Sequence, residues 1–177
     1  MTNKWNFQKP TEEENRISKE LADKLAISPV ICQLLVKRGI TTEEEANKFF
    51  KPSLNDLHDP FLMPDMDKAV KRLNKALGER EKILVYGDYD VDGTTAVSLV
   101  YKFLRPYTTL LDYYIPDRYD EGYGISYKGI DYAADTDVKL IISLDCGIKA
   151  IEKIEYAKKK GIDFIICDHH MPDDTLP

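Results

Sequence analysis

The spacing of apolar residues divides the chain into two regions. Up to residue 77, apolar side chains recur every three or four positions, which is the period of a helix with one buried face. Residues 51–65 interrupt this pattern with three prolines and no period, so we expect a linker there. The predicted helices cover residues 14–25, 28–39, 41–50 and 66–77.

From residue 82 the pattern changes to short apolar runs rich in strand-forming residues. The predicted strands are 82–86, 110–116, 138–144 and 163–167, and the helices between them are 94–104, 126–134 and 149–161. Strands that alternate with helices form parallel sheets whose crossovers place helices on both faces. We therefore predict an α/β domain with an open, mainly parallel sheet at 81–177, after a helical N-terminal segment and linker at 1–80.

Composition is that of an ordinary soluble globular protein and excludes some classes. Of the 177 residues 43% are apolar and 32% are charged, and no apolar run approaches the roughly 18 residues of a membrane span. The polar start lacks the apolar core of a secretory signal. Three cysteines without a CxxC pair favour reduced thiols in a cytoplasmic protein with no membrane association. The net charge of −6 argues against general, charge-driven binding of nucleic acid, but not against a strand held locally.

Acidic residues and histidines follow three of the predicted strands. Asp88, Asp90 and Asp92 come after 82–86, Asp145 comes after 138–144, and Asp168, His169 and His170 come after 163–167. In open parallel sheets, ligands bind outside the carboxyl ends of the strands, so these residues are expected to meet at one edge. Closely spaced carboxylates repel each other unless a cation lies among them or water surrounds them. The pattern predicts a metal site.

A calcium-binding EF-hand loop is one pattern that the stretch VYGDYDVDGT at 85–94 partly fits. Counted from Asp88, the first six positions match, but the twelfth is Leu99 instead of the bidentate glutamate. An apolar side chain cannot supply the two closing oxygens, so this interpretation fails.

A second pattern is the DxDGT motif of haloacid-dehalogenase-type phosphatases, which Asp90-Val91-Asp92-Gly93-Thr94 resembles. In that family Asp90 would attack phosphorus and Asp92 would act as acid and base, with Mg²⁺ holding the phosphate. The apolar run stops at Tyr86, however, which places Asp90 several residues beyond the strand end. This alternative also leaves Asp88, Asp145 and the two histidines without a role.

The third pattern uses all of these residues. GDYDVDG, SLDCG and DHH, in this order after three strands, resemble the first three motifs of the DHH phosphoesterase superfamily. YIPDRYDEGYGIS at 114–126 and the helical leader are similar to its branch of bacterial single-strand-specific 5′→3′ DNA exonucleases. The resemblance implies metal-dependent hydrolysis of phosphodiesters in single-stranded DNA, in DNA repair and recombination. Other members of the superfamily hydrolyse oligonucleotides, cyclic dinucleotides or pyrophosphate, and these substrates remain an alternative.

The resemblance also implies a set of metal ligands. It implies two divalent ions, Mn²⁺ or Mg²⁺, with Asp88 and Asp90 each binding one ion, Asp145 bridging both, and His169 as a further ligand. Carboxylates with an imidazole suit Mn²⁺, and the absence of cysteine from the set argues against structural zinc. Two such ions acidify a water molecule and neutralise charge on the phosphodiester.

Three neighbouring residues receive supporting roles from the same resemblance. His170 would contact the scissile phosphate or assist proton transfer, because strand alternation directs it away from His169. Asp168 would orient the histidines. Asp92 would either support the ligands from behind or cap a helix that begins near Thr94.

Arg118, Gly122, Tyr123 and Gly124 follow the second predicted strand and so face the same edge. An arginine suits phosphate, glycines admit backbone donors, and an aromatic ring can stack on a base, so we predict contact with phosphate or with the strand. A structural turn explains the two glycines equally well. The resemblance implies single-stranded DNA as the partner, with single-strand-binding protein or a helicase as protein partners.

The family pattern includes a fourth motif with one more aspartate and a second domain that closes over the substrate. Neither is found before Pro177, so we expect the chain to be an N-terminal piece of a longer enzyme, weak or inactive alone. A metal-dependent binding module is the alternative from a different functional class.

Overall fold

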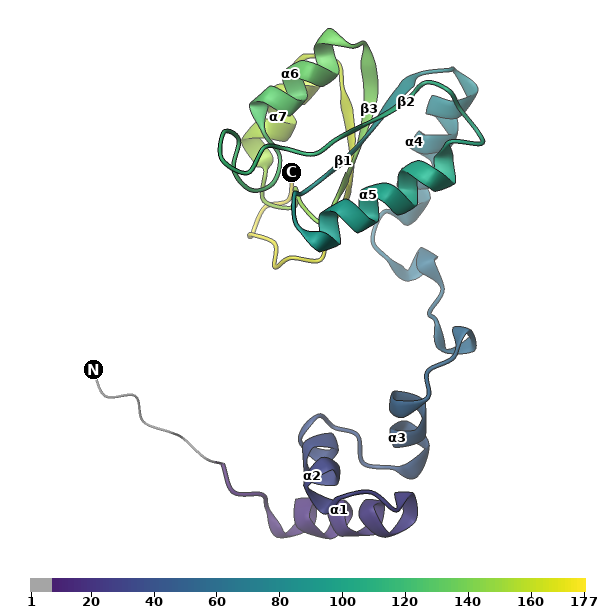
Figure 1. Cartoon of the computed structure of the whole chain (residues 1–177), viewed down its shortest axis with the longest axis vertical. Helices are drawn as coiled ribbons and strands as arrows, with labels where there is room; N and C mark the ends of the chain where they lie inside the picture. Colours follow the sequence, from purple (N-terminus) through teal and green to yellow (C-terminus); the bar gives the residue numbers. More distant parts are fainter. Residues whose placement is uncertain (1–7) are drawn as a thin grey trace, which may run out of the picture. The chain divides into compact units, whose positions relative to one another are not determined.

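The computed structural model describes residues 8–177, which form two compact units (Figure 1). One unit ends at Leu62, and the other runs from Met63 to Pro177. The first seven residues of the predicted N-terminal segment lie outside the described range. No helix in residues 8–177 is long and apolar enough to cross a membrane.

The first unit is helical. It contains α1 (Glu12–Leu25), α2 (Pro29–Lys37), α3 (Glu43–Phe50) and two short 3-10 helices, η1 (Leu54–Asp56) and η2 (Pro60–Leu62), within the predicted linker. Thr11 caps α1 and Thr42 caps α3, each paired with a glutamate three residues later in a capping box. Leu21, Cys32 and Val36 form a small core where α1 packs on α2.

The second unit holds a four-stranded sheet in the order β2-β1-β3-β4, with all neighbouring strands parallel. Its strands are β1 (Lys82–Gly87), β2 (Leu111–Tyr114), β3 (Val138–Leu144) and β4 (Asp163–Cys167). Its helices are α4 (Met66–Gly78), α5 (Val91–Leu104), α6 (Tyr127–Asp135) and α7 (Ile151–Lys159). The predicted α/β class and parallel sheet are confirmed.

Successive residues of β1 point to opposite faces of the sheet, so each face has its own core. Leu84 and Tyr86 belong to the cluster beneath α6 and α7, whereas Ile83 and Val85 belong to the cluster beneath α4 and α5. Figure 1 shows the two helix pairs on opposite sides of the sheet. Burial on both faces explains why the central strands read as continuous apolar runs.

Helix α4 belongs to the sheet-containing unit, although the sequence-based boundary at 80/81 assigns it to the helical segment. Ala76 is fully buried in one of the two sheet cores, with Leu73 and Leu77 packed against it. Arg72 Nε donates to Asp163 Oδ2 of β4 at 2.6 Å. The amphipathic pattern of α4 predicts a buried face but not its partner, which here is the sheet.

Candidate metal centre

The carboxyl ends of β3 and β4 bring one carboxylate and two imidazoles together. Asp145, His169 and His170 each offer a ligand atom within 4.8 Å of the others. Asp145 Oδ1 lies 3.1 Å from His169 Nε2. Asp145 is also held in the left-handed region, at φ 60°, which is uncommon for a residue other than glycine and typical of functional sites. Two imidazoles and a carboxylate suit a divalent ion of the first transition row.

Asp88 is fully buried at the end of β1. Its Oδ1 accepts a hydrogen bond from Tyr89 N at 2.7 Å, but its Oδ2 has no hydrogen-bond partner among the described residues. Burial raises the pKa of Asp88, although the hydrogen bond from Tyr89 N opposes this, and the charge of Asp90 raises it further. A buried carboxylate oxygen without a partner is costly unless a cation binds it, so Asp88 fits a metal ligand.

The cap of α5 is Asp90 and not Asp92. Helix α5 begins at Val91, and Asp90 is its N-cap, with Oδ1 accepting from Gly93 N at 2.9 Å. Asp92 is exposed in the first turn, so its interpretation as the cap is wrong. The side chain of an N-cap accepts a hydrogen bond from the backbone N–H three residues later. Asp90 has this spacing from Gly93 N. Neither Asp88 nor Asp90 belongs to the group around Asp145 in the described chain.

Two glycines allow the start of α5 to approach the end of β1. A Cβ atom on Gly93 would lie 2.5 Å from Asp88 O and 2.6 Å from Asp88 N. A Cβ atom on Gly87 would lie 2.3 Å from Val97 Cγ2. Both positions therefore lack the space for any side chain, and this contact fixes Asp88 against the helix.

Gly93→Ala is expected to lower the free energy of unfolding by about 1–3 kcal/mol, because the methyl group would push α5 off the Asp88 backbone. The same displacement should weaken Mn²⁺ binding. Urea denaturation and calorimetry measure the two effects. Gly78→Ala is the matched control, since its Cβ would meet nothing within 4 Å at the end of α4. Equal stability of the two variants would contradict the close approach.

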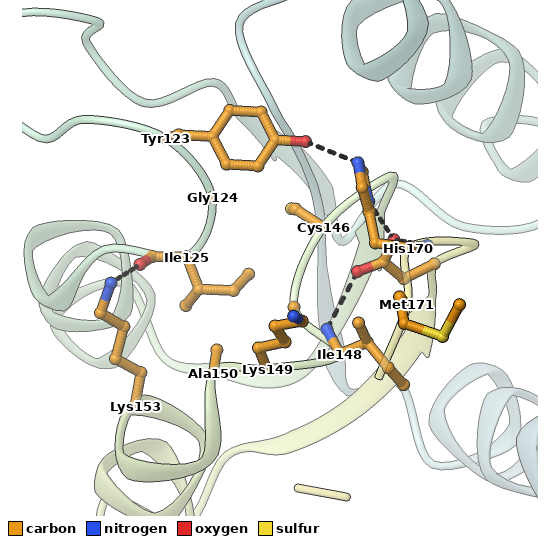
Figure 2. Close-up of a pocket in the computed structure, with 12 residues that line it drawn as sticks. Tyr123, Gly124, Ile125, Cys146, Ile148, Lys149, Ala150, Lys153, His170 and Met171 are labelled. Carbon is orange, nitrogen blue, oxygen red and sulfur yellow. Dashed lines mark hydrogen bonds and ion pairs between the residues drawn. The ribbon is translucent and has the colours of Figure 1, made fainter. Parts of the chain in front are cut away.

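Asp168, which the resemblance implies would orient both histidines, contacts His170. Asp168 Oδ1 lies 2.6 Å from His170 Nδ1, and Oδ2 accepts from Ile148 N at 3.0 Å. His170 Nε2 lies 3.3 Å from the hydroxyl of Tyr123, which Figure 2 shows pointing toward the imidazole ring. Burial raises the pKa of Asp168, but hydrogen bonds from Ile148 and His170 outweigh it and hold the pKa below its ordinary value.

The two histidines do not diverge as strand alternation predicts. Their ring centroids lie 4.8 Å apart, and both rings belong to the group around Asp145. Alternation does not apply because β4 ends at Cys167, before the Asp-His-His segment. No hydrogen bond joins Asp168 to His169 in the described chain, so Asp168 orients only His170.

The pKa of His170 in the metal-free chain is expected to lie above its ordinary value of 6.5, chiefly because of the hydrogen bond with Asp168. A raised folded-state pKa means that protonated His170 stabilises the fold below pH 6.5, and that this stabilisation is lost as pH rises through the folded value. Asp168→Asn should lower the pKa toward 6.5, as measured by NMR titration of the ring. Asp173→Asn removes only the exposed ion pair with Lys149 and should leave the pKa of His170 unchanged.

The loop after β2 brings Arg118 and Tyr123 to the same edge. The Arg118 guanidinium lies 5.3 Å from the centre of the Tyr89 ring, and Tyr89 meets Tyr123 edge to face at 6.1 Å. Gly122 and Gly124 adopt φ values of 78° and 81°, so the turn itself requires glycine at both positions. The backbone conformation of the turn therefore explains both glycines without any contact to a ligand.

Glu121 is a positioning residue that sequence reasoning missed. It accepts hydrogen bonds from Tyr114 OH and from Asp117 N, both at 2.9 Å, and from the hydroxyl of Ser126. Burial raises the pKa of Glu121, but these hydrogen bonds outweigh it and keep the pKa below its ordinary value. Glu121 thereby anchors the turn that carries Arg118 and Tyr123. A single glutamate among polar neighbours gives no sequence signal of this role.

The chain is similar to a known family and to several known proteins. The family described as "DHH family, N-terminal domain" matches residues 82–177. The single-stranded-DNA-specific exonuclease RecJ of Bacillus subtilis (strain 168) is 40% identical over 98% of this chain and 22% of its own length. RecJ of Escherichia coli (strain K12) is 35% identical over 85% of this chain and 26% of its own length. The chain thus spans about a quarter of the length of these relatives.

Two solved structures are similar to this chain. A crystal structure of exonuclease RecJ bound to manganese is 31% identical, with a TM-score of 0.58 over 62% of this chain and 28% of the other. A structure of RecJ in complex with Mn²⁺ from Thermus thermophilus has a TM-score of 0.67 over 92% of this chain and 22% of the other. At 23% identity the second shows the fold alone. The family match decides against the haloacid-dehalogenase-type interpretation of Asp90 and Asp92.

Proposed function

The chain belongs to the DHH family, and from this premise we propose that it forms the N-terminal, metal-binding part of a single-stranded-DNA-specific exonuclease. The observation that carries the proposal is the group of Asp145, His169 and His170 at the carboxyl ends of the strands. The relatives that share this segment are named as exonucleases of that specificity.

We assign the metal ligands to Asp88, Asp90, Asp145 and His169, for two ions of Mn²⁺ or Mg²⁺. The unpartnered oxygen of Asp88 and the pairing of Asp145 with His169 support this assignment. Bound divalent ions supply an acidified water and neutralise charge on the phosphodiester. Asp90 uses Oδ1 to cap α5, which fixes the direction of its carboxylate beside Asp88.

His170 and the loop after β2 would handle the phosphate and its proton. Asp168 fixes the ring of His170 through Nδ1, which leaves Nε2, 3.3 Å from the Tyr123 hydroxyl, as the nitrogen that would exchange a proton with the scissile group. Arg118 would bind a phosphate of the strand, because its guanidinium lies over Tyr89 at the open edge of the site. Tyr123, half exposed beside His170, would contact the nucleotide.

The cellular role follows from the resemblance. We place the activity in DNA repair and recombination in the cytoplasm, with 5′→3′ polarity. Single-strand-binding protein or a helicase would supply the single strand. Asp92, which is exposed in α5, would have no direct contact with the ions.

The test uses the chain at micromolar concentration with Mn²⁺, over hours, on three substrates. We expect slow hydrolysis of single-stranded DNA to 5′-mononucleotides, with less on duplex DNA and on a small phosphodiester such as bis-p-nitrophenyl phosphate. Chelation of the metal should stop the reaction. Preference for the small phosphodiester would favour another phosphoesterase of the family. Cleavage that persists without metal would contradict the proposal.

A further inference from the structure

A pocket of about 460 Å³ lies beside the candidate metal centre, and none of the roles above uses its interior. Residues from three segments, at 123–125, 146–150 and 168–171, line it after β2, β3 and β4, together with Lys153 of α7 (Figure 2). Its volume falls in the range of roughly 300–1,000 Å³ that small-molecule sites occupy. The pocket therefore has room for one small group next to the centre.

The walls of the pocket are mainly apolar. Ile125 and the thiol of Cys146 are buried and form its inner surface, and Ala150 and Met171 line it further out. In Figure 2 the side chains of Ile125 and Ala150 lie on the side opposite Met171. The ammonium group of Lys153 is not available inside the pocket, because it donates a hydrogen bond to Ile125 O at 2.5 Å. Such walls suit a flat, weakly polar group.

One side of the pocket is continuous with the metal centre. His170 lines the pocket and also belongs to the group with Asp145 and His169. The half-exposed Tyr123 lines the pocket, and its hydroxyl lies 3.3 Å from His170 Nε2 and 3.4 Å from Asp145 O, so it contacts both the pocket and the centre. A ligand that holds a phosphate at the centre would thus direct the rest of its nucleotide into the pocket.

We propose that this pocket receives the base of the nucleotide whose phosphate lies at the metal centre. The inference rests on the proposed function only in placing a phosphate at the centre. The base would pack against aliphatic and sulfur-containing side chains, with the Tyr123 ring at the mouth. Because the side chains of Ile125, Ala150 and Met171 carry no group that could hydrogen-bond a base edge, the pocket accepts any of the four bases.

The test measures two probes on the same chain. With Mn²⁺ bound, deoxythymidine 5′-monophosphate is expected to bind about tenfold more tightly than inorganic phosphate, because contact of its base with the pocket adds to the phosphate contact. Without metal, millimolar thymidine should shift the backbone NMR signals of residues 146–150 and 171 selectively. Calorimetry and heteronuclear NMR give these readouts.

Two variants separate the pocket from the centre. Ala150→Leu fills the pocket and should abolish the preference for the nucleotide over phosphate, while changing the Mn²⁺ affinity less than about twofold. Met171→Ala trims the rim and should weaken nucleotide binding with less risk to folding. Ala69→Leu, the same enlargement at a half-buried alanine of α4, is the matched control. It should change neither the preference for the nucleotide over phosphate nor the Mn²⁺ affinity.

The outcomes for the pocket and for the metal centre are distinct. If Mn²⁺ binds but the nucleotide binds no more tightly than phosphate, the base subsite is overturned and the metal centre stands. If the chain binds no Mn²⁺ but thymidine still shifts the signals of residues 146–150, the proposed function fails and the subsite stands. An Ala150→Leu chain that is folded and keeps the nucleotide preference also overturns the subsite.

Discussion

Replacing Asp145 by alanine is expected to lower the affinity of the chain for Mn²⁺ by more than about a hundredfold. Loss of a residue that merely supports a ligand costs roughly 10–100-fold in metal affinity, and loss of a ligand should cost at least as much. Asp145 supplies the carboxylate in its group with His169 and His170, 3.1 Å from His169 Nε2. Calorimetric titration of the metal-free chain with Mn²⁺ measures the change.

Asp92→Ala is the matched control for this experiment. Asp92 is also an aspartate of the acidic cluster, but it is exposed in the first turn of α5. Its removal should cost only the interaction of its charge with the helix N-terminus, about 0.3–1 kcal/mol, and should leave Mn²⁺ affinity nearly unchanged. The assignment is wrong if Asp145→Ala binds Mn²⁺ as the parent does, or if Asp92→Ala loses binding in a folded chain.

The fold could be predicted from the sequence because its signals are local. Each central strand is a short apolar run, and the helices between strands require parallel pairing. The meeting of Asp145 with the Asp-His-His segment also follows, since the carboxyl ends of parallel strands share one edge. The structure brings Asp145, His169 and His170 together at this edge.

Details of the site depend on contacts that the pattern does not encode. Asp90 and Asp92 are both plausible caps by residue type, and only the free amide of Gly93 selects Asp90. The histidines lie together because β4 ends before them, and strand ends are the least certain part of a prediction. Glu121 receives its partners Tyr114 and Ser126 only after the turn between them closes.

The 177 residues alone are expected to hydrolyse single-stranded DNA more than about a hundredfold more slowly than full-length RecJ of Bacillus subtilis. The chain covers 22% of that relative, so most of the relative's length, including any part of it that completes the site or binds the strand, lies outside the shared region. The side chain of His169 is 79% exposed, so water reaches the centre freely.

Substrate positioning decides the size of this effect. Correct positioning of the reacting groups can supply roughly 7–11 kcal/mol of a barrier, and losing about 3 kcal/mol of it slows a reaction by more than a hundredfold. Contacts on a second side of the strand also strengthen binding of single-stranded DNA, through base stacking and positive charge. A single open face provides fewer of these contacts. The measurement is a time course with 5′-phosphorylated single-stranded DNA and Mn²⁺ at equal protein concentrations, with the Asp145→Ala chain as the background. Comparable rates for the two proteins would show that these residues already hold the complete site, and the proposed need for a fourth motif would then be abandoned.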